Sequence, residues 1–167
     1  MIRLERVDWL DPRAVALRSA MDDESGALYA DVTAALPRRD RVTFARALEV
    51  DPADVVATVI AVDEQSGQAT PVGHAGLKRL HDDLAGALEV KKVVVSPERR
   101  GEGISRVLMV ELESIARGLG AAKLVLQTGD RQPAAIALYE KLGYEAIPAF
   151  GGYEIFPPSL HYAKRLD

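Results

Sequence analysis

The sequence predicts a domain of the α/β (α+β) class, with a mixed, mostly antiparallel central sheet flanked by helices. Short alternating or apolar runs, which are typical of strands, are interleaved with segments whose apolar residues recur at helical spacing. Two of the strand-like runs are joined by a loop with a turn signal, which predicts an antiparallel pair. The length of 167 residues is that of about one domain. We therefore expect residues 1–167 to form a single domain.

The N-terminal part of the chain is predicted to contain one strand followed by helices. Residues 2–7 alternate weakly, as in a strand. Asp11 followed by Pro12 is a typical helix start, because Asp caps a helix and Pro is tolerated at its first position. We expect this helix to cover residues 12–21. Residues 22–50 then contain two further helical patterns, separated by a proline-containing break.

Three strands are expected in the middle of the chain. Residues 55–63 and 72–80 have the composition of strands, and the loop between them contains the turn signal Ser66-Gly67. These two strands should therefore form an antiparallel hairpin. A third strand is expected over residues 88–96.

The second half of the chain alternates more regularly between helices and strands. Apolar residues at helical spacing predict a helix over residues 104–119, which Gly118 and Gly120 close. Pro133 opens a second helix, and Gly143 stops it. The remaining segments are strands at 123–128, 144–147 and 160–166, and a loop at 148–159 that is long enough to act as a lid.

Composition and charge exclude several classes of protein. The chain has no cysteine, which removes disulfide frameworks, cysteine-ligated metals and cysteine nucleophiles. A net charge of −4 provides no basic field for nucleic acid. The longest apolar run has eight residues, whereas a membrane-spanning helix needs about 20, and the first residues lack the apolar core of a signal peptide. We expect no nucleic-acid or membrane partner and a cytoplasmic location.

Metal-dependent and serine-dependent chemistry have little support in the sequence. The three histidines are His74, His81 and His161, and they lack the spacing of a metal site, so no metal is expected. No serine can be placed with a histidine and an aspartate in the arrangement of a serine hydrolase.

The most informative segment joins the strand at 88–96 to the helix at 104–119. Gly101 and Gly103 lie at this strand-to-helix turn, where backbone N–H groups and the positive end of a helix suit a pyrophosphate. Arg99 and Arg100 add positive charge. The dinucleotide motif G-x-G-x-x-G fails because residue 106 is arginine, and the P-loop fails because no Gly-Lys-Ser/Thr is present. A tight turn with solvated arginines is an equally good interpretation at this point.

Two motifs together resemble a known family. Arg100-x-x-Gly103-x-Ser105 resembles the acyl-CoA pyrophosphate loop of the GNAT N-acetyltransferase superfamily, Gln/Arg-x-x-Gly-x-Gly/Ala. Residues 132–144, which begin with Gln132, resemble the family's second motif, Asn-x-x-Ala-x-x-Leu-Tyr-x-x-x-Gly-Phe/Tyr. They occur in the family's order with a strand between them, and the resemblance covers about residues 72–166. It implies a GNAT-like acyl-CoA acyltransferase fold.

The resemblance also implies acetyl-CoA as co-substrate and no metal. In the family, the strand before the loop pairs through its backbone with the pantetheine arm, and a backbone N–H polarises the thioester carbonyl as an oxyanion hole does. The residues implied to bind the cofactor are Val93, Val94, Val95, Arg99, Arg100, Gly101, Gly103, Ile104, Ser105, Gln132 and Tyr139.

Two side chains are candidate catalytic residues. Acyl transfer to an amine requires the neutral amine, and the resemblance suggests Glu89 as its base, directly or through water. The alternative role of Glu89 is an ion pair with Lys91, Lys92 or a lysine on a neighbouring strand. Tyr139 is the implied hydrogen-bond donor to the departing CoA thiolate. Its alternative role is that of an aromatic residue packed on the inner face of a helix.

The acceptor is the part of the function that the sequence leaves most open. By resemblance, its site is formed by residues 21–50 and 148–159, where Phe150 and Tyr153 could form the wall of a small pocket. The acidic run at residues 22–24 could attract an amine, although such a run is more often a solvated helix end. We expect a small-molecule or peptide amine as acceptor, and the chain is compatible with a homodimer. The alternatives are a non-catalytic acyl-CoA-binding module and a phosphate-binding interaction domain.

Overall fold

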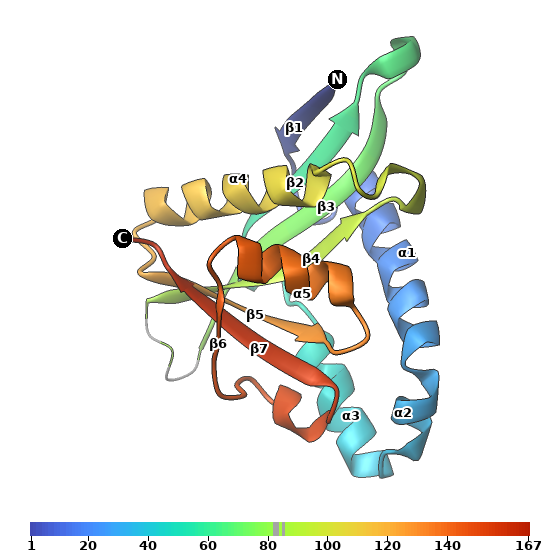
Figure 1. The fold of residues 1–167 in the computed structure, drawn as a ribbon, viewed down its shortest axis with the longest axis vertical. Coiled ribbons are helices and arrows are strands. Elements are labelled where there is room, and N and C mark those ends of the chain that lie inside the picture. The colour runs from blue at the N-terminus through green and yellow to red at the C-terminus, as the bar shows by residue number, and fades with distance from the viewer. Residues whose placement is uncertain (82–83, 85) are drawn as a thin grey trace.

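The computed structural model describes residues 1–81, 84 and 86–167, and it contains one seven-stranded sheet with helices on both sides (Figure 1). The spatial order of the strands is β1-β2-β3-β4-β5-β7-β6, and every neighbouring pair is antiparallel except β4 and β5. This confirms the predicted mixed, mostly antiparallel α/β class. The strands are β1 (Ile2–Arg6), β2 (Val55–Asp63), β3 (Thr70–Arg79), β4 (Ala87–Val95), β5 (Lys123–Gly129), β6 (Glu145–Ala146) and β7 (Ser159–Arg165).

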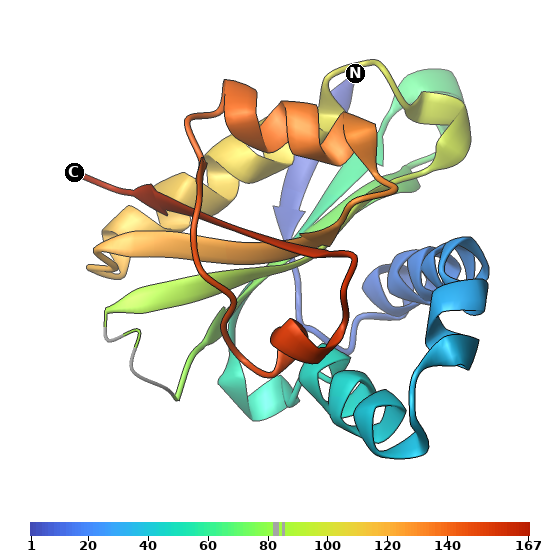
Figure 2. The same cartoon turned by 60° about the horizontal axis from the view of Figure 1, so that its bottom comes forward.

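The helices form two groups on opposite faces of the sheet. Figure 2 shows the N-terminal helices on one side of the sheet and the C-terminal helices on the other. The first group is α1 (Pro12–Leu28), α2 (Ala30–Ala35) and α3 (Arg38–Leu48), and the second is α4 (Ile104–Gly118) and α5 (Pro133–Lys141). None of the helices in the described part of the chain is long and apolar enough to cross a membrane.

The central strands are buried on both faces, which explains their continuous apolar runs. In β2, Val59 and Ala61 pack into the cluster around α4, whereas Ile60 and Val62 pack against Leu17 of α1 and its neighbours. Successive residues of a strand point to opposite faces, so an uninterrupted apolar run is required where both faces are covered.

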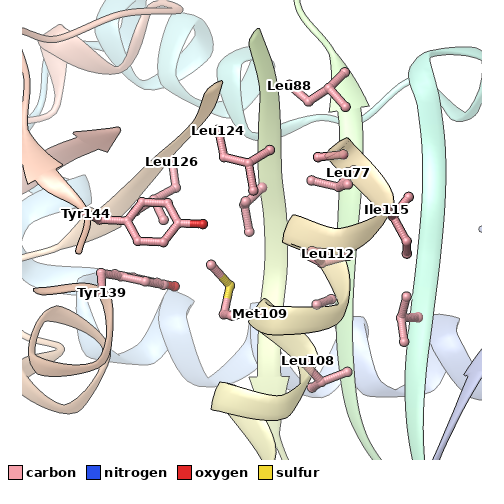
Figure 3. Packing of buried hydrophobic residues seen from close by; sticks show 14 of the residues in the cluster. Leu77, Leu88, Leu108, Met109, Leu112, Ile115, Leu124, Leu126, Tyr139 and Tyr144 are labelled. Atoms are coloured by element: carbon pink, nitrogen blue, oxygen red, sulfur yellow. The ribbon is translucent and has the colours of Figure 1, made fainter. Parts of the chain in front are cut away.

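Helix α4 carries the main core. Leu108, Leu112 and Ile115 recur at helical spacing and face the sheet (Figure 3). Val107 and Leu119, which belong to the same apolar pattern in the sequence, are instead exposed in the structure. The buried face is therefore narrower than the sequence pattern.

Strands β4 and β5 separate partway along their length. Their parallel pairing runs from Ala87 and Lys123 to Glu89 and Val125 and then stops, although both strands continue (Figure 1). Beyond Glu89, the β5-facing edge of β4 has no strand partner among the described residues. The sheet thus contains a wedge-shaped opening next to the loop that precedes α4.

Most predicted elements are confirmed, and three differ. The first helix was expected over residues 12–21, but it extends through the acidic run to Leu28. The strand expected at 144–147 has only two residues. The loop at 148–159 includes a buried 3-10 turn rather than an open lid, because Tyr153 and Phe156 pack with Tyr29 and Phe44 in an aromatic cluster.

Candidate active site

Two cavities meet at the wedge between β4 and β5. The larger has a volume of about 620 Å³ and the smaller about 180 Å³. Val93, Ala135 and Tyr139 line both of them. A ligand in one cavity can therefore contact a ligand in the other at this junction.

The smaller cavity gathers the residues that the sequence motifs single out. It is enclosed by the end of β4, the loop before α4 and the inner face of α5. All of the predicted cofactor-binding residues line it except Gln132, which lines the larger cavity at the N-cap position of α5. Residues that are up to 46 positions apart in the sequence are thus brought to one small space.

The loop before α4 has the backbone geometry of an anion site. Gly101 and Gly103 have φ angles of 83° and 80°, and a Cβ atom built on either would meet no atom within 4 Å. Gly103 is the N-cap of α4, where no side chain caps the first backbone N–H groups. These donors and the positive end of a helix dipole suit a phosphate or pyrophosphate.

The two arginines of this loop are already engaged by carboxylates. Arg99 forms ion pairs with Asp63 and Glu102. The Arg100 guanidinium donates to both carboxylate oxygens of Glu24 in α1, at 2.9 and 2.6 Å. A phosphate that used Arg100 would have to compete with Glu24.

A bulge in β4 lies beside the junction. Between His74 and Gly76, two steps along β3 correspond to three steps along β4, and Lys92 has a φ angle of 56°. The His74 ring contacts the Lys92 carbonyl oxygen through Nδ1 at 2.7 Å, which holds the bulge in place. The following residues, which begin at Val93, thus present an unpaired backbone edge toward β5.

Tyr139 lies at the junction of the two cavities. Its side chain is buried, lines both cavities and packs near Tyr144 and Tyr162 with ring centroids 6.0 and 6.3 Å away (Figure 3). Burial raises the pKa of Tyr139 to about 12. The phenol is therefore protonated at neutral pH and can donate a hydrogen bond.

Glu89 does not line either cavity. It is 2% exposed, and its Oε1 accepts a hydrogen bond from the Tyr153 hydroxyl at 2.6 Å. Lys78 and Lys91 each place an Nζ atom 3.5 Å from a Glu89 carboxylate oxygen. The ion pair that the sequence allowed for Glu89 is therefore present with Lys91 and Lys78, whereas Lys92 pairs with Asp22.

Lys91 connects this buried group to the larger cavity. Its Nζ donates to the Tyr153 hydroxyl at 2.6 Å, and its side chain lines the cavity. Burial lowers the pKa of Lys91, and the charge of Glu89 raises it in part. The sequence allowed the pair of Glu89 with Lys91, which are two residues apart on one strand and so share a face, but it did not predict that Tyr153 joins them.

The larger cavity has apolar walls from the helical layer and the late loop. These segments, at residues 21–50 and 148–159, are the ones that the sequence assigned to the acceptor. Phe156 rather than Phe150 or Tyr153 is the lining residue of the late loop. Other large apolar side chains in the wall include Trp9, Met21, Tyr29, Phe44 and Leu48.

The charged groups of the larger cavity are mainly cationic. Asp22 and Glu49 are its acidic lining residues, and Asp22 is held by Lys92. The basic lining residues are Arg18, Arg41, Lys91 and Lys92. Within the described residues, no group of three or more histidine, aspartate or glutamate side chains is placed to hold a metal ion.

Comparisons with known proteins agree with these features. A family model described as the acetyltransferase (GNAT) family matches residues 17–144. An IAA acetyltransferase from Azospirillum brasilense is 41% identical over 85 residues, which are 51% of this chain and 56% of that protein. The chain thus spans about half the length of this curated relative.

Two solved structures show the same fold over the whole chain. A crystal structure from Klebsiella pneumoniae, assigned as an acyl-CoA N-acyltransferase, is 27% identical with a TM-score of 0.77, and the match covers 100% of this chain and 99% of that one. An N-acetyltransferase from Thermoplasma acidophilum in complex with coenzyme A is 15% identical with a TM-score of 0.65, and the match covers 99% of each chain. The second comparison is a likeness of fold alone.

Proposed function

The chain belongs to the acetyltransferase (GNAT) family, and we propose that it transfers an acetyl or other short acyl group from acetyl-CoA directly to a primary amine. The observation that carries this proposal is the junction of the two cavities at Val93, Ala135 and Tyr139. An anion site on one side and an apolar pocket on the other suit a transfer between a CoA thioester and a separate acceptor. The match of the acetyltransferase (GNAT) family model supports an acyl-CoA as the donor.

In this proposal, the backbone holds the cofactor. The N–H groups of Gly101, Gly103 and the first turn of α4 bind the pyrophosphate. The unpaired edge of β4 from Val93 to Val95 pairs with the amide groups of the pantetheine arm, as a further strand would. A backbone N–H at the bulge then stabilises the negative charge that develops on the thioester oxygen.

The reaction itself is a direct displacement. The amine nitrogen forms a bond to the thioester carbonyl carbon, the carbon–sulfur bond breaks, and the leaving thiolate takes a proton from the Tyr139 hydroxyl. The nitrogen gives up one proton, and the Tyr139 oxygen regains one from solvent, so the products are an amide and free CoA. A Tyr139 pKa of about 12 keeps the donor protonated until the sulfur needs it.

Glu89 remains our candidate for the ultimate acceptor of the amine proton, acting through Tyr153 and Lys91. We expect Glu89→Gln to reduce turnover at neutral pH and to recover in part at high pH, where the amine is already neutral. A matched control is Glu113→Gln, because Glu113 is also buried and paired with a lysine, Lys164, but lines neither cavity. A Glu89→Gln defect that does not change with pH would assign Glu89 to the ion pair alone.

The deciding experiment measures thiol release from acetyl-CoA with a panel of amines, beside a calorimetric titration with CoA. Binding together with amine-dependent thiol release supports the transferase. The buried position of Glu89 favours the second candidate, a non-catalytic acyl-CoA-binding module, which would bind CoA without thiol release. Failure of CoA to bind would contradict both.

A further inference from the structure

Arg18 is a buried cation in the wall of the larger cavity. It lies on α1 and is 8% exposed. Its Nη2 donates to the Trp9 carbonyl oxygen at 2.7 Å, its Nη1 contacts His74 Nε2 at 3.2 Å, and its guanidinium carbon is 3.7 Å from the centroid of the Trp9 ring. Within residues 1–81, 84 and 86–167, no carboxylate forms an ion pair with it. These contacts use only part of its five N–H donors.

His74 cannot supply the missing negative charge. Arg18 can only donate, so His74 Nε2 accepts, and the ring proton lies on Nδ1, which donates to the Lys92 carbonyl oxygen at 2.7 Å. Burial, together with the charges of Arg18 and Lys92, lowers the pKa of His74 to about 4, so the ring is neutral at neutral pH. Burial lowers the pKa of Arg18, and the charge of Asp22, four residues further along α1, raises it in part, although Asp22 is itself ion-paired with Lys92. A buried guanidinium without an ion-pair partner of its own is costly, and an anionic ligand group would relieve that cost.

The other charged groups of the cavity differ from Arg18. Lys91 is paired with Glu89, and Lys92 with Asp22. Arg41 is exposed to solvent. With Lys91 and Lys92 balanced in this way, the remaining charged lining residues in the described part of the chain are Arg18 and Arg41 against Glu49. This positive excess disfavours a polyamine and favours an acceptor with a negative group.

The position of Arg18 restricts how far that negative group lies from the reacting amine. Arg18 contacts His74, and His74 contacts the carbonyl of Lys92, the residue directly before Val93 at the junction. The His74 ring thus lies between the guanidinium and the bulge, where the thioester is proposed to lie. A carboxylate and an amine that are close together on one molecule fit this arrangement.

We propose that the acceptor is an amino acid with an apolar or aromatic side chain, whose carboxylate binds Arg18 while its amine faces the junction. This inference rests on the proposed acyl transfer. The guanidinium offers paired donors that match a carboxylate. The apolar side chain lies against Phe44, Phe156 and the neighbouring aromatic wall, in a volume of about 620 Å³ that suits a small molecule.

The test compares amine acceptors with and without the carboxylate. Because a carboxamide also lowers the pKa of the α-amine, every kcat/KM is expressed per concentration of the neutral amine. L-Phenylalanine, L-leucine and L-methionine are each compared with their carboxamides in the thiol-release assay, with the full chain and saturating acetyl-CoA. We expect at least one acid to have a kcat/KM at least tenfold above that of its carboxamide. In Arg18→Gln this ratio should fall toward one, mainly through KM. If Arg18→Gln does not fold, the comparison of acids with carboxamides in the wild-type protein still tests the inference.

Two controls separate Arg18 from other sources of anion binding. Arg46→Gln removes the same charge from an exposed position on α3 that lines neither cavity, so the ratio between acid and carboxamide should remain. A calorimetric titration with CoA should give the same affinity in Arg18→Gln as in the wild-type protein. Loss of CoA affinity would instead place a cofactor phosphate at Arg18 and overturn the inference.

The remaining outcomes separate the inference from the proposed function. Equal use of acids and carboxamides, or a preference for carboxamides, would overturn the carboxylate site and leave acyl transfer intact. If CoA binds but no amine is acetylated, the transferase proposal fails. The melting temperature of the CoA-saturated protein then decides whether the larger cavity contains a carboxylate site. A larger increase with the acid than with its carboxamide, lost in Arg18→Gln, supports the carboxylate site, and equal increases overturn it.

Discussion

The two cavities present their polar groups in opposite ways. The smaller is formed mainly by backbone, with glycines at positive φ and the open N-terminus of α4, and the arginines beside it are neutralised by carboxylates of the protein itself. The larger is formed by side chains, and its buried Arg18 has no carboxylate partner in the described part of the chain. Backbone geometry thus prepares one cavity for its ligand, whereas unbalanced charge prepares the other.

This contrast predicts different sensitivities to mutation. A backbone site should tolerate changes of side-chain charge but not the addition of a side chain where a ligand must approach. A side-chain site should behave in the opposite way. Tyr139 belongs to both cavities, so it tests whether they operate as one site.

The largest effect is expected for Tyr139→Phe. The ring and its packing are kept and only the hydroxyl is lost, so stability should change little while kcat falls roughly 10²-fold to 10⁴-fold, as for a lost general acid. CoA affinity, measured by calorimetry, should persist. Tyr144→Phe is the matched control, since Tyr144 is buried in the same cluster but lines neither cavity. Wild-type turnover in Tyr139→Phe would remove its hydroxyl from the reaction.

Gly103→Val tests the backbone site. The branched side chain would occupy the open space where the pyrophosphate is proposed to approach. Loss of two hydrogen bonds to a charged group, each worth about 1.5–3 kcal/mol, should weaken CoA binding by at least about 10²-fold.

The control for this variant is Gly120→Val. Gly120 has a φ angle of 76° and the same open surroundings, but it lies beyond the C-terminal end of α4 and away from both cavities. The two variants should therefore lose similar stability, while only Gly103→Val loses CoA affinity. Equal CoA affinity in the two folded variants would show that the loop is only a turn.

The free energy of unfolding should depend on pH through His74, which contacts Arg18 in the wall of the larger cavity. The pKa of His74 is lowered to about 4 in the folded protein from an ordinary value of 6.5, so between these values the unfolded chain binds more protons. Stability is therefore complete above pH 6.5 and falls as the pH decreases toward 4, by roughly 3 kcal/mol. Burial also lowers the pKa of His161, which acts in the same direction.

Urea unfolding at a series of pH values measures this dependence. His74→Gln should flatten the slope between pH 6.5 and 4, whatever its effect on absolute stability. A slope in the variant equal to that of the wild-type protein would show that His74 is already protonated in the folded state, so that its contact with Arg18 would need a different explanation.

The same contrast explains how much the sequence could predict. The pyrophosphate loop and α5 were readable because their signals are local: glycines at positive φ, a proline at a helix start and apolar residues at helical spacing. The wedge between β4 and β5 follows from the resemblance rather than from periodicity. Backbone-formed features are encoded within short segments, and short segments can be read from one sequence.

The side-chain features depend on contacts between distant residues. Glu89 and Tyr153 are 64 positions apart, and Arg18 and His74 are 56 apart. Nothing in the pattern of α1 distinguishes Arg18 from a solvated arginine. The late loop reads as an open lid because its glycines and prolines are visible in the sequence, whereas the aromatic cluster that buries Tyr153 and Phe156 forms only in the folded chain.

The smallest effect is expected for an ion pair between α1 and the smaller cavity. Glu24 of α1 holds Arg100 of the pyrophosphate loop, and both side chains are about half exposed, so the pair is worth about 0–1 kcal/mol. If a CoA phosphate displaces the Glu24 carboxylate from Arg100, Glu24→Gln should strengthen CoA binding by a factor of up to about five. The melting temperature should remain nearly unchanged. Calorimetry at low salt gives the best resolution, because salt screens the attraction within exposed ion pairs.

The control for this variant is Glu111→Gln. It breaks another exposed ion pair, with Arg6, on residues that line neither cavity, and it should leave CoA affinity unchanged. Weaker CoA binding in Glu24→Gln would mean that Glu24 orients Arg100 for the cofactor instead of competing for it. Arg100 would then be oriented for its ligand by a side chain of α1, and the smaller cavity would no longer be a site formed mainly by backbone.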